Sequence, residues 1–508
     1  MSNISKVFAA ELEGIDARLI EVETDINTGL HAFNIVGLAD KALSEAKERV
    51  NSALKNAGVK APTRENRKIV VNLAPADVKK TGSQYDLAIA IGYLIATGQI
   101  KKFDASNKIF VGELSLSGGL RSVNGALSIA RLAKKAGFEY LFLPEQNAAE
   151  AAMIPGIKVI PITKLGELIE HLEGKLIIAD QPATKILGDA NVQHQVDLSE
   201  VRGQENAKRA LTIAAAGGHN LLMVGPPGTG KTMLAQALAS ILPALNLEEV
   251  IELTQIYSSA GVLGGLPYIS ARPFRAPHHT ASPVSVIGGG QNPKPGEISL
   301  AHRGVLFLDE LPEFRRDLLE ALRQPLEGGK VSVARAKQSL TFPSKFMLVA
   351  AMNPCPCGYH GDPEKECRCS AFEVFRYQKK ISGPLLDRID IQINVPRMTI
   401  TELRATKKKE AEAIKEKIFA VRETQRERLA DQKIFTNSEM SSKLVEKLVN
   451  LDKSGEDFIP QAFDKEMLST RGYYRVLKVA RTIADLEGAK QVTEQHLAEA
   501  LGYRLRLA

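Results

Sequence analysis

A short apolar run, a glycine-rich turn and a helical pattern follow one another at residues 221–242, and this feature most constrains the fold. The turn reads G-x-x-x-x-G-K-T. Its glycines let backbone N–H groups face phosphate oxygens, and the following helix N-terminus adds positive potential. We therefore expect a P-loop made of Gly225, Pro226, Pro227, Gly228, Thr229, Gly230, Lys231 and Thr232. In ATP binding, Lys231 would contact the β- and γ-phosphates and Thr232 would ligate Mg²⁺.

Two further apolar runs end in polar residues that suit the same site. Residues 304–308 lead into Asp309 and Glu310, and residues 346–352 lead into Asn353. In a parallel sheet, residues that face the ligand lie at the carboxyl ends of the strands. We expect Asp309 to hold Mg²⁺ through water, Glu310 to polarise the attacking water and Asn353 to orient that water. These motifs predict an α/β ATPase.

Length and composition indicate several domains and no membrane segment. A chain of 508 residues is too long for one ordinary core. Its longest apolar run, 87–97, is too short to cross a bilayer and is expected to form a buried helix. The first residues lack the apolar region of a signal peptide, so we expect a cytoplasmic protein. The net charge of +7 permits a nucleic-acid partner but does not argue for one.

Changes in pattern divide the chain into four stretches. Residues 1–175 have the pattern of a mixed α/β domain, and residues 176–196 lack a clean period and are interpreted as a linker. Residues 197–398 alternate strands and helices, and residues 399–508 are helical. In the first stretch we expect a helix at 43–54 and strands at 69–73, 108–111 and 140–143. Residues 257–304 are rich in Gly, Pro and His, and a loop of this length is usually functional.

All cysteines of the chain lie in one short window: Cys355, Cys357, Cys367 and Cys369. Four thiolates suit tetrahedral Zn²⁺, and the intervening glycines and prolines allow tight turns. The C-x-C spacing is less typical of zinc than C-x-x-C, and an iron–sulfur cluster or four unliganded thiols remain alternatives. His278 and His279 are interpreted as part of the Gly/Pro/His-rich segment, because adjacent side chains rarely converge on one metal.

The order of the motifs carries a family resemblance. GPPGTGKT, LFLDE, AAMNP and LLDRID follow one another as in AAA+ ATPases, and RPFRAPHHTAS resembles the helix-2 insert of the magnesium-chelatase-like group. Over essentially its whole length the chain resembles the ComM/YifB family of that group. The resemblance implies an AAA+ core at 197–398 and a helical lid at 399–508, preceded by a Lon-protease-like α/β domain at 1–175.

The resemblance also assigns roles to individual residues. Asn353 matches sensor 1, Arg471 matches sensor 2, and Arg388 matches the arginine finger that reaches the ATP of a neighbouring subunit. Such a finger implies a ring of identical subunits, expected to be a hexamer, in which a cation from the neighbour offsets charge on the transferring phosphoryl group. The alternative for Arg388 is a surface ion pair with Asp387 or Asp390.

The Lon-like domain departs from active Lon proteases at the two positions that matter. Gln84 lies nearest the nucleophile position, with Ser83 beside it, and Ser128 takes the position of the lysine. A serine nucleophile without a lysine base is not activated, so we expect no peptidase activity.

The family implies a DNA translocase or helicase that promotes branch migration on single-stranded or branched DNA. Residues 330–343 match a hairpin that faces the ring pore in related helicases, and the basic residues in and beside it are Lys330, Arg335, Lys337 and Lys345. Such cations can grip phosphates without reading sequence, although an ordinary exposed hairpin is the alternative. A magnesium chelatase motor and a protein-remodelling ATPase remain open. The Lon-like domain and the lack of a D-x-S-x-S motif argue against the chelatase.

Overall fold

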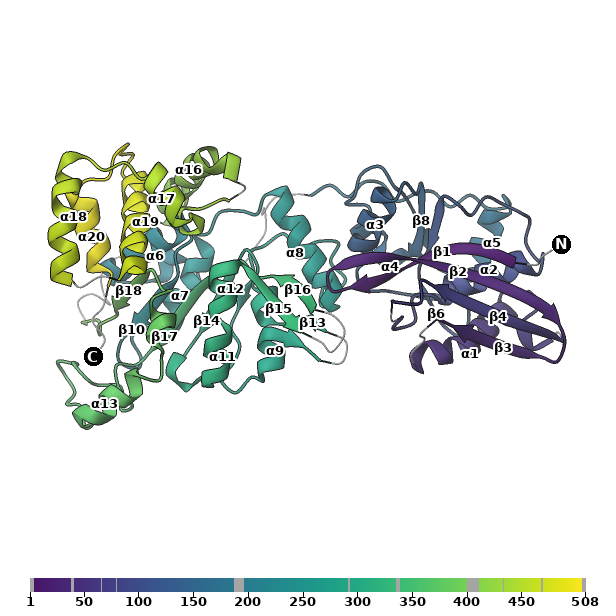
Figure 1. Cartoon of the computed structure of the whole chain (residues 1–508), viewed down its shortest axis with the longest axis horizontal. Coiled ribbons are helices and arrows are strands. Elements are labelled where there is room, and N and C mark those ends of the chain that lie inside the picture. The colour runs from purple at the N-terminus through teal and green to yellow at the C-terminus, as the bar shows by residue number, and fades with distance from the viewer. Residues whose placement is uncertain are drawn as a thin grey trace. The chain divides into compact units, whose positions relative to one another are not determined.

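The chain forms two compact units in the computed structural model (Figure 1). The structure describes residues 4–37, 41–64, 66–78, 80–186, 196–290, 293–334, 339–399, 411–432, 434–466 and 469–504. Unit 1 contains residues 1–187 and 247–270, and unit 2 contains residues 188–246 and 271–508. The segment 247–270 lies inside the range expected for the ATPase core, yet its contacts are with unit 1.

Unit 1 is built on a seven-stranded mixed sheet of order β3-β4-β2-β1-β5-β8-β9. The strands are β1 (Ile4–Glu13), β2 (Asp16–Thr28), β3 (Ala32–Val36), β4 (Arg67–Ala74), β5 (Lys108–Phe110), β8 (Tyr140–Pro144) and β9 (Lys158–Ile162). The β1–β2 and β2–β4 pairs are antiparallel, and the other neighbours are parallel. A small hairpin joins β6 (Glu113–Leu114) to β7 (Leu120–Arg121).

The helices of unit 1 include those expected from apolar spacing. They are α1 (Lys41–Asn56), α2 (Asp86–Ala96), α3 (Ala126–Lys135), α4 (Glu145–Ala151), α5 (Leu165–Leu172) and α8 (Leu247–Ala260). The helices expected at 43–54 and 87–97 and the three strands expected in this unit are confirmed. In α2 nine consecutive residues from Asp86 to Leu94 are buried, which is why its sequence shows a continuous apolar run and no amphipathic period.

Helix α8 bonds through buried polar groups to α4 and to the turn between β1 and β2. The Ser258 hydroxyl donates to Glu150 at 2.5 Å, and the Gln255 amide donates to the Ile15 carbonyl at 2.7 Å. Burial raises the pKa of Glu150. Buried polar groups need such partners, so these bonds fix which side of α8 faces the rest of unit 1.

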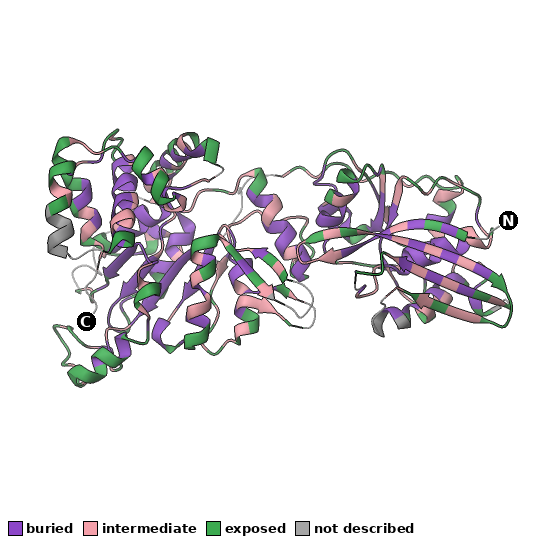
Figure 2. Ribbon diagram, in the orientation of Figure 1, coloured by how far each residue is buried: buried purple, intermediate pink, exposed green. Residues whose placement is uncertain are grey.

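Unit 2 contains a parallel five-stranded sheet of order β11-β14-β17-β10-β18. The strands are β11 (Phe274–Arg275), β14 (Val305–Leu308), β17 (Met347–Met352), β10 (Leu221–Val224) and β18 (Ile391–Asn394). Every residue of β10, β14 and β17 is buried, as the purple strands in Figure 2 show. The strands expected at 221–224, 304–308 and 346–352 are confirmed, and continuous burial explains their unbroken apolar runs.

Alternate residues of these strands enter two separate cores. Leu221 and Met223 pack in a core with α6 (Glu205–Gly217), α7 (Lys231–Ser240) and the C-terminal helices. Leu222 and Val224 pack in a second core on the opposite face of the sheet. The helices that contribute to this second core are α9 (Pro283–Ile287), α10 (Glu297–Leu300), α11 (Arg316–Ala321), α13 (Ala371–Gln378) and α14 (Gly383–Leu386).

The C-terminal stretch is helical, as expected. Its described helices are α16 (Ala411–Leu429), α17 (Ser442–Leu448), α18 (Lys453–Glu466), α19 (Thr470–Leu486) and α20 (Glu494–Gly502). No helix in the described ranges is both long and apolar enough to cross a membrane.

The Gly/Pro/His-rich segment 257–304 is more regular than its sequence indicated. It contains the end of α8, helices α9 and α10, and a hairpin of β12 (Gly288–Gly289) with β13 (Lys294–Pro295). Val286 and Ile298 are fully buried and anchor α9 and α10 in the core. The expectation of one long loop was therefore wrong, because single apolar residues without a period anchor these short elements.

Candidate nucleotide site

The P-loop joins β10 to α7, and its glycines allow the tight turn. Gly228 and Gly230 have φ angles of +80° and +84°, a region that favours glycine. Gly225 lies so close to the backbone of Val395 that a β-carbon would be 2.3 Å from its carbonyl oxygen. The turn therefore leads directly into the N-terminus of α7, whose free N–H groups form a site suited to phosphate.

Lys231 is buried at the base of this turn. Its Nζ donates to the carbonyl oxygens of Gly225 at 2.7 Å and Pro226 at 2.9 Å, and to Asn353 Oδ1 at 3.2 Å. Burial lowers the pKa of Lys231, while the charges of Asp309 and Glu310 oppose that shift. Lys231 is thus in direct contact with Asn353, the residue that follows β17.

Thr232 and Asp309 form the next contact along the sheet edge. The Thr232 hydroxyl donates to Asp309 Oδ2 at 2.9 Å, and the backbone N–H of Glu310 donates to Asp309 Oδ1 at 2.9 Å. Both carboxylate oxygens are therefore oriented. Mg²⁺ prefers oxygen ligands and is usually bound by one or two carboxylates, water and substrate phosphates, so this pair fits it.

Glu310 follows in a strained conformation. Its φ angle is +52°, which is unusual for a residue with a side chain and costs on the order of 1–3 kcal/mol. Its carboxylate is half exposed, and its Oε2 lies 3.4 Å from His279 Nδ1. The sequence did not indicate that His279 belongs to this site. The histidine lies in the segment between the P-loop and β14, and no motif spacing links it to Glu310.

Arg388 and Arg471, predicted to be the arginine finger and sensor 2, both lie beside Glu327. Glu327 of α12 (Arg323–Gly328) is 2.5 Å from the Arg388 guanidinium and 3.6 Å from that of Arg471. Arg388 is buried, whereas the Arg471 side chain is 60% exposed. Glu327 was not singled out from the sequence. Nothing in the sequence around Glu327 indicates that it lies beside Arg388 and Arg471.

Asp390, one of the partners considered for Arg388, has other contacts. It is buried and pairs with Arg475 of α19 and with His219. Although burial opposes the shift, Arg475 and His219 hold the pKa of Asp390 well below its usual range. This carboxylate therefore joins the end of β18 to the C-terminal helices.

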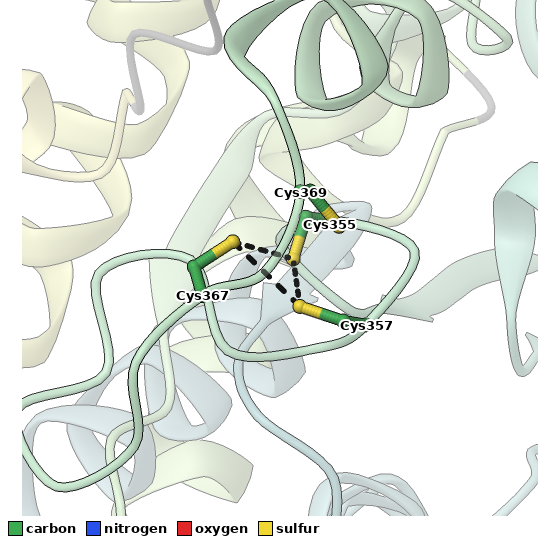
Figure 3. A group of neighbouring side chains, drawn as sticks. All are labelled: Cys355, Cys357, Cys367 and Cys369. Carbon is green, nitrogen blue, oxygen red and sulfur yellow. Dashed lines mark hydrogen bonds between the residues drawn. The ribbon is translucent and has the colours of Figure 1, made fainter.

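The four cysteines gather in the loop after Asn353 (Figure 3). Cys355 Sγ lies 3.4 Å from that of Cys357 and 3.7 Å from that of Cys367, which is 3.6 Å from Cys357. All four sulfur atoms lie within 4.8 Å of one another. These separations exceed the roughly 2.05 Å of a disulfide. They approach the S···S distance of about 3.8 Å that Zn–S bonds of about 2.3 Å give in a tetrahedron.

Comparisons with known proteins cover nearly the whole chain. Profiles of magnesium chelatase subunit ChlI match residues 22–147 and 197–403, and that of its C-terminal part matches 408–504. Competence protein ComM of Haemophilus influenzae is 43% identical over 506 residues, which is 99% of this chain and 97% of that protein. YifB of Escherichia coli is 41% identical over 504 residues, with the same coverage. The chain belongs to the ComM/YifB family of magnesium-chelatase-like AAA+ ATPases.

Magnesium chelatase itself is a more distant relative of this ComM/YifB-family protein. The 38 kDa subunit from Chlorobaculum parvum is 24% identical over 337 residues, which is 61% of this chain and 89% of that subunit. The similarity to ComM and YifB extends over both units, whereas the similarity to the chelatase subunit covers a smaller part of this chain.

In this ComM/YifB-family ATPase the expected hairpin cations differ in their surroundings. The hairpin consists of β15 (Lys330–Ala334) and β16 (Ser339–Pro343). Lys330 is exposed at its start, whereas Lys345 pairs with Glu439 at 2.7 Å. Arg335 and Lys337 lie outside the described residues. Lys330 is therefore the hairpin cation whose described surroundings leave it open to a ligand.

Proposed function

We propose that this protein is a cytoplasmic ring motor that hydrolyses ATP to move along DNA and to promote branch migration of recombination intermediates. The observation that supports ATP chemistry most directly is the contact of Thr232 with Asp309 beside the Lys231–Asn353 hydrogen bond. The proposal for DNA rests on the likeness to ComM and on the basic hairpin. The proposed cofactors are ATP, Mg²⁺ and a structural Zn²⁺ bound by the cysteines.

Each residue of the site has a distinct proposed task. Lys231 and the N–H groups of the P-loop bind the β- and γ-phosphates, and Thr232 and Asp309 bind Mg²⁺. Glu310 accepts a proton from the attacking water, which Asn353 orients for in-line attack. His279 is within reach to orient the Glu310 carboxylate before nucleotide arrives. Bound phosphate would replace the carbonyl oxygens that Lys231 contacts.

Arg388 is proposed to act on the ATP of the neighbouring subunit in a hexameric ring. Its pair with Glu327 would keep this buried guanidinium oriented, and Arg471 reaches the same carboxylate from α19. Motion of the C-terminal helices during the ATP cycle would then be linked to the finger. The proposal places hydrolysis under control of ring closure.

The Arg388→Ala protein is expected to bind ATP normally and to hydrolyse it on the order of 100-fold more slowly or worse, since a finger contributes at least this much. Mixing it with the Lys231→Ala protein should restore part of the steady-state ATPase rate, because some interfaces then combine an intact P-loop with an intact finger. Glu327→Gln keeps the guanidinium and removes only its partner charge, so it should lose less activity than Arg388→Ala. If no mixture of Arg388→Ala with Lys231→Ala recovers activity, Arg388 does not act across subunits.

The test of the DNA motor is the ATPase rate of the full-length protein with and without single-stranded and forked DNA. We expect a several-fold stimulation that weakens as salt rises, because phosphate contacts release counterions. Lys330→Glu should lower the stimulation without changing the basal rate. Unchanged turnover and no DNA binding at low salt would overturn the DNA proposal and favour protein remodelling, whereas porphyrin-dependent turnover would favour a chelatase motor.

The Lon-like unit is proposed to lack peptidase activity. The Gln84 amide donates to Glu11 at 2.7 Å, and the Ser128 hydroxyl donates to the Ile15 carbonyl at 2.6 Å. Ser83, next to the nucleophile position, donates to Glu113. These partners support a structural or binding role for the unit, because an active dyad requires a serine paired with a lysine.

A further inference from the structure

We propose that the four cysteines and one Zn²⁺ form a clamp that fixes the P-loop, so that nucleotide affinity depends on the bound metal. This inference rests on the proposed nucleotide site and adds a means of control to it. The segment concerned, residues 355–369, is called the cysteine loop below. It begins two residues after Asn353, at the carboxyl end of the central strand β17.

The cysteine loop has almost no apolar core of its own. Cys355 and Gly358 are its buried residues, while Pro356, Pro363 and the charged residues 364–366 are exposed. A segment that buries so little apolar surface does not offset its conformational entropy. Small structures of this kind are commonly held by a metal ion, whose binding free energy then stabilises the fold. The cluster of four sulfurs supplies the ligands for such an ion.

The sulfur cluster also has the supporting contacts typical of a metal–thiolate site. The backbone N–H of His360 donates to Cys355 Sγ at 3.3 Å. Hydrogen bonds from the backbone orient metal ligands and stabilise the thiolate form. Four sulfurs and tetrahedral spacing favour Zn²⁺ over the harder divalent cations, which prefer oxygen.

Gly358 carries the contact between the cysteine loop and the P-loop. Its backbone lies against the Pro227 ring so closely that a β-carbon would be 2.7 Å from Pro227 Cδ and 2.8 Å from Cγ. A turn bond from Gly358 N–H to the Cys355 carbonyl, 3.0 Å long, holds the glycine between two metal ligands. The position of Pro227 is therefore coupled to the geometry of the sulfur cluster.

Further contacts join the cysteine loop and the residue before it to α13 and to Arg397. Gln378 of α13 donates to the Pro354 carbonyl at 3.0 Å, immediately before the first cysteine. Arg397 pairs with Asp362 at 2.8 Å and lies 5.5 Å from the Tyr359 ring centroid. The P-loop therefore approaches the segment after β18 at Gly225 and the cysteine loop at Pro227.

The first measurement is metal content. Full-length protein, purified without chelator, is expected to contain one zinc per chain, and Cys357→Ser should lose most of it. Replacement by Co²⁺ should give the absorption of tetrahedral cobalt–thiolate coordination. Protein without metal, or with the visible spectrum of an iron–sulfur cluster, overturns the zinc site.

The second measurement is the affinity for Mg·ADP by calorimetry. Gly358→Ala should keep its zinc but bind ADP on the order of tenfold more weakly, because the methyl group displaces Pro227. Gly361→Ala is the matched control. Gly361 lies in the same loop and also has a positive φ, +76°, yet a β-carbon there meets nothing within 4 Å. Its ADP affinity should equal that of the wild type.

Removal and return of the metal complete the test. Stripping zinc from the wild type should weaken ADP binding by a similar factor, and added Zn²⁺ should restore it. This rescue keeps the test valid if Cys357→Ser fails to fold. Unchanged ADP affinity in both the stripped protein and Gly358→Ala overturns the clamp. Zinc-loaded wild-type protein that binds no ADP would instead contradict the nucleotide site itself.

Discussion

The Lys231→Ala protein is expected to bind ATP and ADP on the order of 100-fold more weakly than the wild type, a loss of about 2.7 kcal/mol. In the proposed site, Lys231 is the buried cation that would face the phosphates, and alanine leaves no group that could replace it. Its bonds to the carbonyls of Gly225 and Pro226 also shape the turn, so the loop loses an internal support as well. Calorimetry with Mg·ADP measures the effect directly.

A matched lysine shows whether the loss is specific. Lys158 of β9 forms an exposed pair with Glu139, and such pairs contribute little to stability. Lys158→Ala should therefore bind nucleotide like the wild type. Near-normal ADP affinity of a folded Lys231→Ala protein would remove the basis for the whole nucleotide site.

The second large effect is expected from Glu310→Gln, which should bind ATP tightly and hydrolyse it about 10²–10⁴-fold more slowly, the usual contribution of a general base. The amide keeps the shape of the side chain but cannot accept a proton. Because only chemistry is lost, kcat should fall while nucleotide affinity is retained. Single-turnover hydrolysis and ADP calorimetry on the same sample separate the two quantities.

Glu313→Gln is the control for this variant. Glu313 follows three residues later and pairs with Lys380 on the surface at 3.1 Å. Its loss should leave turnover unchanged. If Glu310→Gln hydrolysed ATP at the normal rate, another residue would have to act as the base. His279 would then be the first to test, since it already lies near the same carboxylate.

The parts of the site that follow one another in sequence could be predicted, and those made by distant contacts could not. Buried parallel strands leave unbroken apolar runs, so the ends of β10, β14 and β17 were visible from sequence. The approach of His279 to Glu310 and of Gly358 to Pro227 joins segments with no common period. Nothing in local composition specifies which glycine a distant proline will touch.

The same limit applies to the N-terminal unit. The long hairpin of β1 and β2 was not predicted, because residues 9–11 of β1 are all buried and interrupt the alternation that marks a strand. Its register is fixed by ten residue pairs around a turn at Gly14, whose φ is +70°. The range 197–398 predicted for the ATPase core includes α8, because sequence neighbours usually share a domain, yet the structure groups residues 247–270 with unit 1.

The position of α8 has a consequence for any attempt to dissect the protein. A fragment that starts near residue 196 would still carry this helix, but Ser258 and Gln255 would lose Glu150 and Ile15 as hydrogen-bond partners. Conversely, the first 187 residues expressed alone would lack α8, which belongs to the same compact unit. The chain leaves the first unit after residue 187 and returns to it at residue 247, so a single cut near residue 196 cannot separate the two units without removing α8 from its own.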